Sequence, residues 1–473
     1  MEDARSYVML APERHCIALL TLLFALAEAL AAEPPVAQDI AFINARVLTM
    51  NEPEALDGQT VIVRDGRVHA IGPTTELPPG PEDRVIDAGG RTLMPGLAEM
   101  HAHVPVPQGP NQPPGYTQDV LMLWVANGVT LARGMLGHPL HLELRDQLER
   151  HEILGPRLIT SGPSFSGQSV DHLAAAAHRV AAQAEAGYDF LKIHPGLSRE
   201  QYDAIVAAAD AADIRLAGHV PVDVGLPRAL HAGQETIDHL DGYIHVLAQD
   251  LDEHEAAAHA FFGAALTPHA DREAIVAAAA ETRNSGAAVV PTETLFENFL
   301  AAVEDFDALR ERPENVYLPP ALKAAYMARL AHAGAMADSL GDFVALRKEI
   351  IGALHRAGVP ILLGADSPQI MNVPGFATHR ELEAMVASGL SPFAALASGT
   401  VAPARFYGAE GRYGSIVPGA DADLILLRED PLEDIRHTRS IDGVMVRGRW
   451  LERDFLDAEL KRIRQRYAAL QHE

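Results

Sequence analysis

The sequence predicts an α/β protein, a (β/α)8 TIM barrel with a small β-sandwich domain built from both ends of the chain. Its 473 residues suit a large barrel and a satellite domain better than one small domain. In the middle of the chain, short apolar runs alternate with Ala-rich amphipathic stretches, which is the pattern of successive βα units. Two β-rich segments bracket this middle, one near each end, and we expect them to form the satellite domain together.

Residues 1–32 are expected to form a signal peptide that is removed from the mature protein. Arg14 and His15 precede an apolar run over 17–30, which is too short to cross a bilayer comfortably. The run ends in small residues, and we expect cleavage near Ala31. The protein is therefore expected to be exported, periplasmic or secreted, with an N-terminal anchor or an amphipathic helix as the alternative reading of this segment.

Charge and cysteine content restrict the partners and the chemistry. The formal net charge of −26 argues against nucleic acid and anionic membrane surfaces as partners. We expect a small-molecule substrate and no membrane association of the mature form. Cys16 is the only cysteine and would be lost with the signal peptide. Any metal must then be held by nitrogen and oxygen ligands.

The sandwich domain is expected to use residues 38–92 and 413–453. Asp65-Gly66 is a hairpin signal in the first of these segments. The β-rich runs within the two segments cover 43–48, 60–68, 422–427 and 444–450. A charged helix over about 456–470 is expected in the C-terminal segment 454–473.

The barrel is expected over residues 93–412. Its eight strand-like apolar runs occupy 93–103, 129–133, 157–161, 190–193, 215–219, 236–239, 288–291 and 361–366. Amphipathic helices are expected between most of these runs, for example over 170–187, 199–212 and 343–357. The stretches 250–281 and 295–336 are longer than a barrel needs, and we expect them to form a lid or a contact in a homo-oligomer.

Candidate metal ligands fall at the ends of the predicted strands, where active sites of such barrels lie. Strand alternation places the two imidazoles of the His-Ala-His sequence on one face, so that they could hold one cation. A single histidine at a strand end is more often a hydrogen-bonding group than a ligand. Four histidines and an aspartate at strand ends together indicate a metal site. The candidate ligands are His101, His103, Lys192, His219, His239 and Asp366.

Lys192 is the most informative of these residues. An ammonium group pointing at a dication would be repelled, so an unmodified Lys192 would lean away and pair with a carboxylate. The alternative is a lysine that has reacted with CO2 to give a carbamate, N6-carboxylysine, whose two oxygens can bridge two metals. Only four of the 38 basic residues are lysines, and arginine cannot form a carbamate. A lysine at this strand end therefore favours the carbamate.

Several motifs resemble those of the amidohydrolase superfamily, in particular its imidazolonepropionase-like and prolidase-like (Xaa-Pro dipeptidase-like) branch. The resemblance covers nearly all of the chain after the signal peptide. The opening Leu93-Met94-Pro95-Gly96-Leu97 with His101 and His103 is the most specific motif, and it carries Glu99 where many relatives have aspartate. The remaining motifs are Asn-Gly-Val-Thr at 127–130, Phe-Leu-Lys-Ile at 190–193, Gly-His-Val at 218–220, Gly-Ala-Asp at 364–366, His-Arg-Glu-Leu at 379–382 and the segment 414–424.

The resemblance implies a role for each candidate ligand. His101 and His103 would bind the more buried metal together with Asp366. His219 and His239 would bind the more exposed metal, and carboxylated Lys192 would bridge the two.

The implied chemistry agrees with the residue types. Two divalent metals would lower the pKa of a bridging water, giving a hydroxide that attacks an amide carbonyl. Asp366 would act as the general acid/base that moves the proton to the leaving amine. Zinc is the favoured ion, although sites of histidine and carboxylate also accept manganese or cobalt.

Four further residues in the predicted βα loops are candidates for contact with substrate. Tyr243 and His245 follow the sixth run and could contact a carbonyl or carboxylate, or simply pack. Arg133 and His138 lie at the end of the second run and after it, and could bind an anionic group.

We therefore expect a two-metal amide hydrolase that acts on a dipeptide or an N-acyl amino acid. Two enzyme alternatives, a cyclic amide hydrolase of the imidazolonepropionase kind and a deaminase, would need one metal and no carbamate. A catalytically inactive barrel used for binding is the alternative of a different class. The number of metal ions bound per chain distinguishes these alternatives.

Overall fold

The computed structural model describes residues 39–107, 109–170, 172–249, 259, 261–332 and 337–471. The predicted signal peptide and Cys16 lie outside the described residues. Within the described ranges, no helix combines the length and the apolar character needed to span a bilayer. The expected excursion 250–281 is described only from residue 261 onward, apart from His259.

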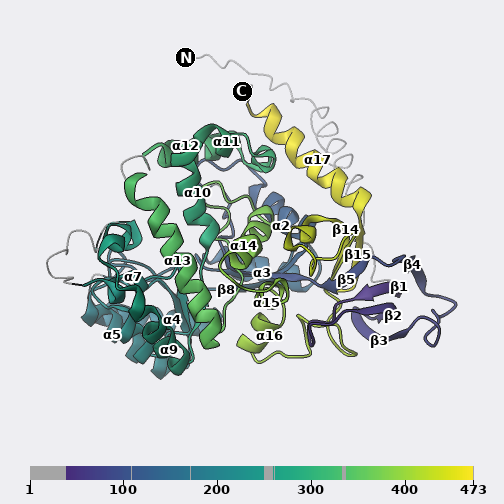
Figure 1. Cartoon of the computed structure of the whole chain (residues 1–473), viewed down its shortest axis with the longest axis horizontal. Helices are drawn as coiled ribbons and strands as arrows, with labels where there is room; N and C mark the ends of the chain where they lie inside the picture. Colours follow the sequence, from purple (N-terminus) through teal and green to yellow (C-terminus); the bar gives the residue numbers. More distant parts are fainter. Residues whose placement is uncertain are drawn as a thin grey trace, which may run out of the picture. The chain divides into compact units, whose positions relative to one another are not determined.

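Strands from the two ends of the chain form one sheet of eight strands, seen at the right of Figure 1. Its order is β15-β14-β13-β5-β1-β2-β3, and β4 pairs with β1. We expected one small β-sandwich domain built from both chain ends. The hydrogen bonds join the strands in a single sheet because β5 pairs with β1 on one side and with β13 on the other. The strands are β1 (Ile40–Val47), β2 (Leu56–Arg64), β3 (Arg67–Pro73), β4 (Arg84–Asp87), β5 (Thr92–Pro95), β13 (Leu424–Leu427), β14 (Ile441–Val446) and β15 (Arg449–Glu452).

The predicted strand over 93–103 is in fact two strands that belong to different sheets. It breaks at Gly96, whose backbone N–H donates to the carbonyl of Asp423, while the N–H of Leu97 donates to the carbonyl of Gly128. A Cβ atom at position 96 would lie 2.2 Å from the Thr130 hydroxyl. The glycine therefore allows the close approach at which the chain leaves one sheet and enters the next.

The middle of the chain contains two parallel sheets, of order β6-β7-β8 and β12-β11-β10-β9. Their strands are β6 (Leu97–Ala102), β7 (Val129–Gly134), β8 (Arg157–Thr160), β9 (Leu191–Ile193), β10 (Leu216–Gly218), β11 (Thr236–Asp238) and β12 (Ala288–Val290). Isolated parallel bridges continue the pairing between them: Ser161 with Phe190, Val289 with Ile361, and Ala102 with Ser367. The last two bridges bring the predicted eighth run, 361–366, between β12 and β6.

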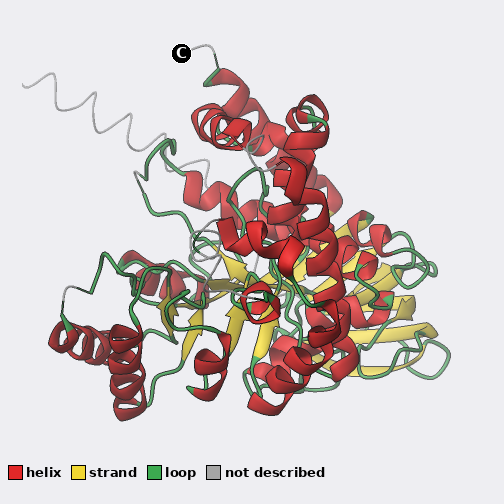
Figure 2. Cartoon of the chain, turned by 60° about the vertical axis from the view of Figure 1, so that its left-hand side comes forward, coloured by secondary structure: helices red, strands yellow, loops and turns green. Residues whose placement is uncertain are grey.

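Helices follow most of these strands along the chain, and Figure 2 shows the helices in red around the strands in yellow. The predicted helix over 199–212 has those bounds in the structure, because the Ser198 side chain caps its start and Gln201 completes a capping box. The α-helices are α2 (Tyr116–Ala126), α3 (Leu140–Glu149), α4 (Leu173–Ala186), α5 (Arg199–Ala212), α6 (Leu226–His231), α7 (Tyr243–Leu247), α9 (Ile275–Ser285), α10 (Glu293–Glu304), α11 (Phe306–Arg310), α12 (Pro320–Leu330), α13 (Ala337–Ala357), α14 (Phe376–Ala387), α15 (Pro392–Ser398), α16 (Val401–Phe406) and α17 (Arg453–Ala469). The 3-10 segments are η3 (Phe261–His269), η4 (Arg272–Ala274), η5 (Pro313–Tyr317) and η7 (Ile435–Arg439).

In its described part, 295–332, the expected excursion contains most of α10 and all of α11, η5 and α12. It reaches the segment that follows the eighth run, because the Tyr326 hydroxyl of α12 donates a 2.7 Å hydrogen bond to the carbonyl of Pro368. This contact lies two residues beyond Asp366. The excursion therefore supports the chain next to a predicted ligand.

Candidate metal centre

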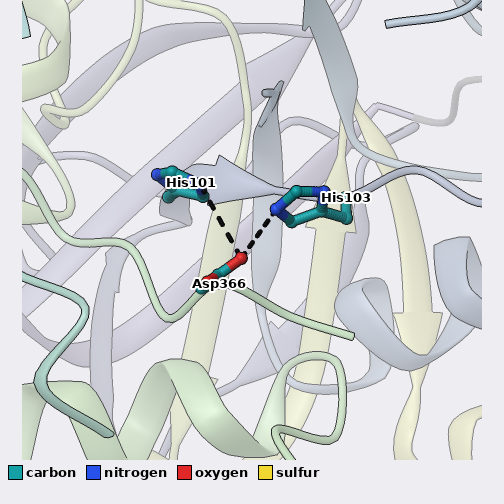
Figure 3. Close-up of side chains that lie close together, drawn as sticks. All are labelled: His101, His103 and Asp366. Carbon is teal, nitrogen blue, oxygen red and sulfur yellow. Dashed lines mark ion pairs between the residues drawn. The ribbon is translucent and has the colours of Figure 1, made fainter. Parts of the chain in front are cut away.

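His101, His103 and Asp366 meet where β6 and the eighth run lie side by side (Figure 3). The Nε2 atom of His103 is 2.7 Å from Asp366 Oδ1, and the Nε2 atom of His101 is 3.7 Å from the same oxygen. One ligand atom from each of the three residues lies within 4.8 Å of the other two. The expected alternation along the first strand thus brings both imidazoles to one carboxylate.

The other three predicted ligands join this group through short contacts. The ring centroid of His239 lies 4.5 Å from that of His101 and 4.4 Å from that of His219. The Lys192 Nζ atom is 3.3 Å from Asp238 Oδ2, and that oxygen is 3.0 Å from His101 Nδ1. The six side chains that the sequence singled out therefore form one contiguous cluster.

Asp238 is part of the cluster although the sequence analysis did not select it. Strand alternation predicts that Asp238 and His239 point to opposite faces of β11. The backbone of His239 is left-handed, with φ of 60°, so that the strand ends there and alternation no longer applies. Burial by itself would raise the pKa of Asp238, but Lys192 and Arg133 bring it below its usual value. The only signal for Asp238 in the sequence was its position directly before His239.

As an unmodified lysine, Lys192 pairs with a buried carboxylate, which is the alternative to the carbamate that the sequence left open. Its side chain is fully buried. Burial lowers the pKa of Lys192, although Asp238 and Asp366 act in the opposite direction. Burial thus favours the neutral amine that reaction with CO2 requires.

The tautomer of His239 follows from its hydrogen bonds. Its Nδ1 atom is 2.7 Å from the Thr292 hydroxyl oxygen. That hydroxyl donates its one hydrogen to the carbonyl of Pro291, at 2.8 Å. Thr292 must therefore accept from Nδ1–H of His239, which leaves Nε2 with a free lone pair for a cation.

His219 is oriented in the same way by a carboxylate. Its Nδ1 atom is 2.7 Å from Asp241 Oδ2, which also accepts a hydrogen bond from the backbone N–H of Val220. Burial lowers the pKa of His219 to about 3, and it also lowers the pKa of His101 and His239. Neutral imidazoles at neutral pH are the form that binds a metal.

A comparison with protein families decides the assignment of the chain. The sequence model of the amidohydrolase family matches residues 92–451, which is most of the chain. The chain belongs to the amidohydrolase family. Over 66 residues, 14% of its length, this amidohydrolase is 36% identical to an adenine deaminase of Ruegeria sp. (strain TM1040). The match spans only 11% of that relative's length.

Solved structures share the fold of this amidohydrolase over almost its whole length. A bottromycin amidohydrolase is 23% identical with a TM-score of 0.70, over 96% of this chain and 94% of that one. A putative prolidase from Bifidobacterium longum is 24% identical with a TM-score of 0.63, over 91% of this chain and 100% of that one. At these identities the similarity establishes the fold alone.

The donor set of the amidohydrolase fits a divalent cation. It combines neutral imidazoles with a carboxylate, and these are ligands that zinc, manganese and cobalt accept. The buried atoms Asp366 Oδ1 and Asp238 Oδ1 have no hydrogen-bond partner among the described residues. A bound cation would satisfy the Asp366 oxygen, which two imidazoles already face.

Arg347, far along the sequence on α13, holds the backbone around His239. The Arg347 guanidinium is buried and donates to the carbonyls of His239, at 2.7 Å, and Pro291, at 2.9 Å. It also pairs with Glu293 at 2.9 Å and lies 3.5 Å from the centroid of the Phe296 ring. Sequence reasoning missed Arg347 because no local pattern links it to β11.

Two of the four candidate residues for substrate contact have buried side chains. Tyr243 is buried, and its hydroxyl hydrogen-bonds the Thr282 hydroxyl of α9 at 2.8 Å, so it packs in the interior. Arg133 is fully buried, with its Nη1 atom 3.2 Å from the Thr236 hydroxyl and its guanidinium 4.4 Å from the Phe190 ring centroid. Tyr243 therefore takes the packing role that was its alternative, and Arg133 has no exposed surface at which to bind an anionic group.

The other two expected contacts lie nearer the surface. His138 accepts a hydrogen bond from the backbone N–H of Leu140 at 3.2 Å, which places it at the start of α3. His245 lines a cavity together with Asp241 and Phe262. Of the four residues, His245 is therefore the one whose position keeps it a candidate for substrate contact.

Thr292→Val is expected to weaken metal binding by about tenfold to hundredfold, the usual effect of losing a group that orients a ligand histidine. Valine has the same shape but cannot accept the Nδ1 hydrogen of His239. Competition with a chelator measures the affinity. Thr294→Val is the matched control, because Thr294 is equally buried and has no hydrogen bond to a histidine in the described part of the chain. Equal affinities in the two variants would contradict the orienting role of Thr292.

Proposed function

We propose that this chain is a metal-dependent hydrolase that cleaves a carbon–nitrogen bond, an amide or peptide bond, in a dipeptide or an N-acyl amino acid. The observation that carries the proposal is the convergence of His101, His103 and Asp366 with His219, His239 and Lys192. Family membership supports it. The eight parallel segments are taken to form a closed (β/α)8 barrel, with this cluster at the C-terminal ends of the strands.

The ligand roles are proposed residue by residue. His101, His103 and Asp366 would hold one cation, His219 and His239 a second, and Lys192 as a carbamate would bridge them. When bound, two divalent cations, with zinc favoured, would supply a hydroxide at neutral pH and polarise the scissile carbonyl. Thr292 and Asp241 would keep the Nε2 atoms of His239 and His219 unprotonated.

Asp366 is proposed to move the proton. Its Oδ1 atom is buried, faces two imidazoles and has no hydrogen bond from the described residues. It would accept the proton of the attacking water and deliver it to the nitrogen of the leaving amine, which is a poor leaving group without it. The products are a carboxylic acid and a free amine.

A one-metal enzyme, either a cyclic amide hydrolase or a deaminase, is the second candidate. Two observations favour it: Lys192 lies against Asp238, and His101, His103 and Asp366 form a compact group by themselves. In that case Lys192 stays an amine and turnover does not depend on bicarbonate.

Export of the protein remains a prediction from residues 1–32.

Hydrolysis assays test the proposal directly. The purified chain is loaded with zinc, manganese or cobalt, with and without bicarbonate, and offered dipeptides, N-acyl amino acids, lactams and aminopurines. We expect release of free amine from a linear amide, stimulated by bicarbonate. Turnover of lactams or aminopurines alone would favour the second candidate, and no turnover of any compound in the metal-loaded protein would contradict an enzymatic function.

A further inference from the structure

A cavity of about 400 Å3 borders the His219 end of the cluster. Asp241 and Val220, which hydrogen-bond each other beside His219, are part of its wall. The ring of Phe262 is another part, and its centroid lies 6.4 Å from that of His219 and 5.8 Å from that of His239. A group seated in this cavity would therefore be next to two of the proposed ligands.

Phe262 is held in an unusual backbone conformation. Its φ of 53° is in the left-handed region, which costs free energy for a bulky side chain and persists only where the surroundings enforce it. The next residue, Gly263, is also left-handed, and a Cβ atom there would lie 2.9 Å from the His245 ring. The chain thus turns sharply at 262–263, and the turn points the Phe262 ring at the histidines.

The Phe262 ring also packs against a second phenylalanine ring, that of Phe296. It meets Phe296 edge to face, with centroids 4.9 Å apart and ring planes at 90°. Phe296 in turn lies against the buried Arg347 guanidinium, which holds the carbonyl of His239. Phe296 and Arg347 therefore stabilise both the cavity wall at Phe262 and the backbone of the proposed ligand His239.

The lining defines the chemistry that the cavity can accept. Val220, Val222, Phe261 and Phe262 supply apolar surface, and the charged side chains are carboxylates, of which Asp223 is exposed. No lysine or arginine is among the described residues that line it. Apolar surface favours an aliphatic or aromatic group, and the carboxylates disfavour an anion.

We propose that this cavity is the specificity subsite for an apolar substrate group without negative charge, and that Phe262 determines the selectivity. This inference rests on the proposed hydrolysis of amides. The substrate would place an aliphatic or aromatic side chain against the Phe262 ring, on the side of the scissile bond that faces His219 and His239.

Selectivity ratios test the subsite. In the metal-loaded parent, dipeptides that vary one side of the bond at a time should show kcat/KM at least about tenfold higher for Leu or Phe than for Ala at one of the two positions. At that same position Gln should be preferred over Glu, which has nearly the same shape and differs in charge. Phe262→Ala should reduce the Phe-to-Ala ratio by about tenfold. Phe262→Gly, which also relieves the left-handed strain, should reduce it equally.

Phe455→Ala on α17 is the control, because Phe455 is exposed and lies outside the cavity lining. It should keep the parent ratios. If the parent hydrolyses amides but Phe262→Ala and Phe262→Gly both keep the parent Phe-to-Ala ratio, or if Glu is accepted as well as Gln, the subsite is wrong while the proposed function stands. If the parent hydrolyses no amide, the proposed function fails first.

Discussion

Asp366→Asn is expected to reduce kcat by at least about a thousandfold, within the range that loss of a positioned acid/base produces. The amide has the shape of the carboxylate but cannot accept the proton of the attacking water or return it to the leaving amine. Steady-state hydrolysis of the best linear amide measures the loss. The unfolding transition should stay close to that of the parent, because the change removes no apolar contact.

Asp307→Asn is the matched control for this substitution. The Asp307 side chain is 73% exposed and pairs with Arg310 on the surface, so its change should leave kcat unaltered. If Asp366→Asn kept a near-normal rate, Asp366 would not be the general acid/base, and the assigned chemistry would need another proton carrier.

Lys192→Ala is expected to lower the metal content by one ion per chain and to reduce kcat by at least about a hundredfold. The physical reason is the loss of the one anionic group proposed to bridge the two cations. A short carboxylate such as acetate or propionate, added to the assay, should partly restore both quantities because it can occupy the space of the missing carbamate. Metal analysis and turnover are measured on the same samples.

Lys348→Ala is the control for this experiment, since Lys348 pairs with Glu297 near the surface of α13. Lys348→Ala should change neither the metal content nor kcat. Full metal content and full activity in Lys192→Ala would exclude the carbamate. The observed pairing of Lys192 with Asp238 would then be the functional arrangement.

Local patterns were sufficient for much of the fold and for the membership of the cluster. The helix over 199–212 was predictable because its cap and its apolar spacing are encoded within the helix and the residues next to it. His101, His103, Lys192, His219 and His239 could be selected because strand ends in successive βα units lie on one side of a parallel sheet. The structure brings all of them together with Asp366.

The features that were missed depend on contacts between distant parts of the chain. The split at Gly96 follows from the closeness of Thr130, and the single sheet follows from β5 pairing on both sides. Asp238 and His239 face the cluster together because the left-handed backbone of His239 ends the strand alternation at that residue. The burial of Arg133 could not be predicted either, because the sequence does not show whether a charged residue at a strand end faces a loop or the core.

The metal-to-protein ratio of the purified chain tests the central claim most directly. Elemental analysis after zinc loading and removal of free metal should give two ions per chain in the parent. His101→Ala combined with His103→Ala should lose at least one of them. A parent chain that hydrolyses amides while holding no metal, or a double variant that keeps the full ratio, would contradict the account.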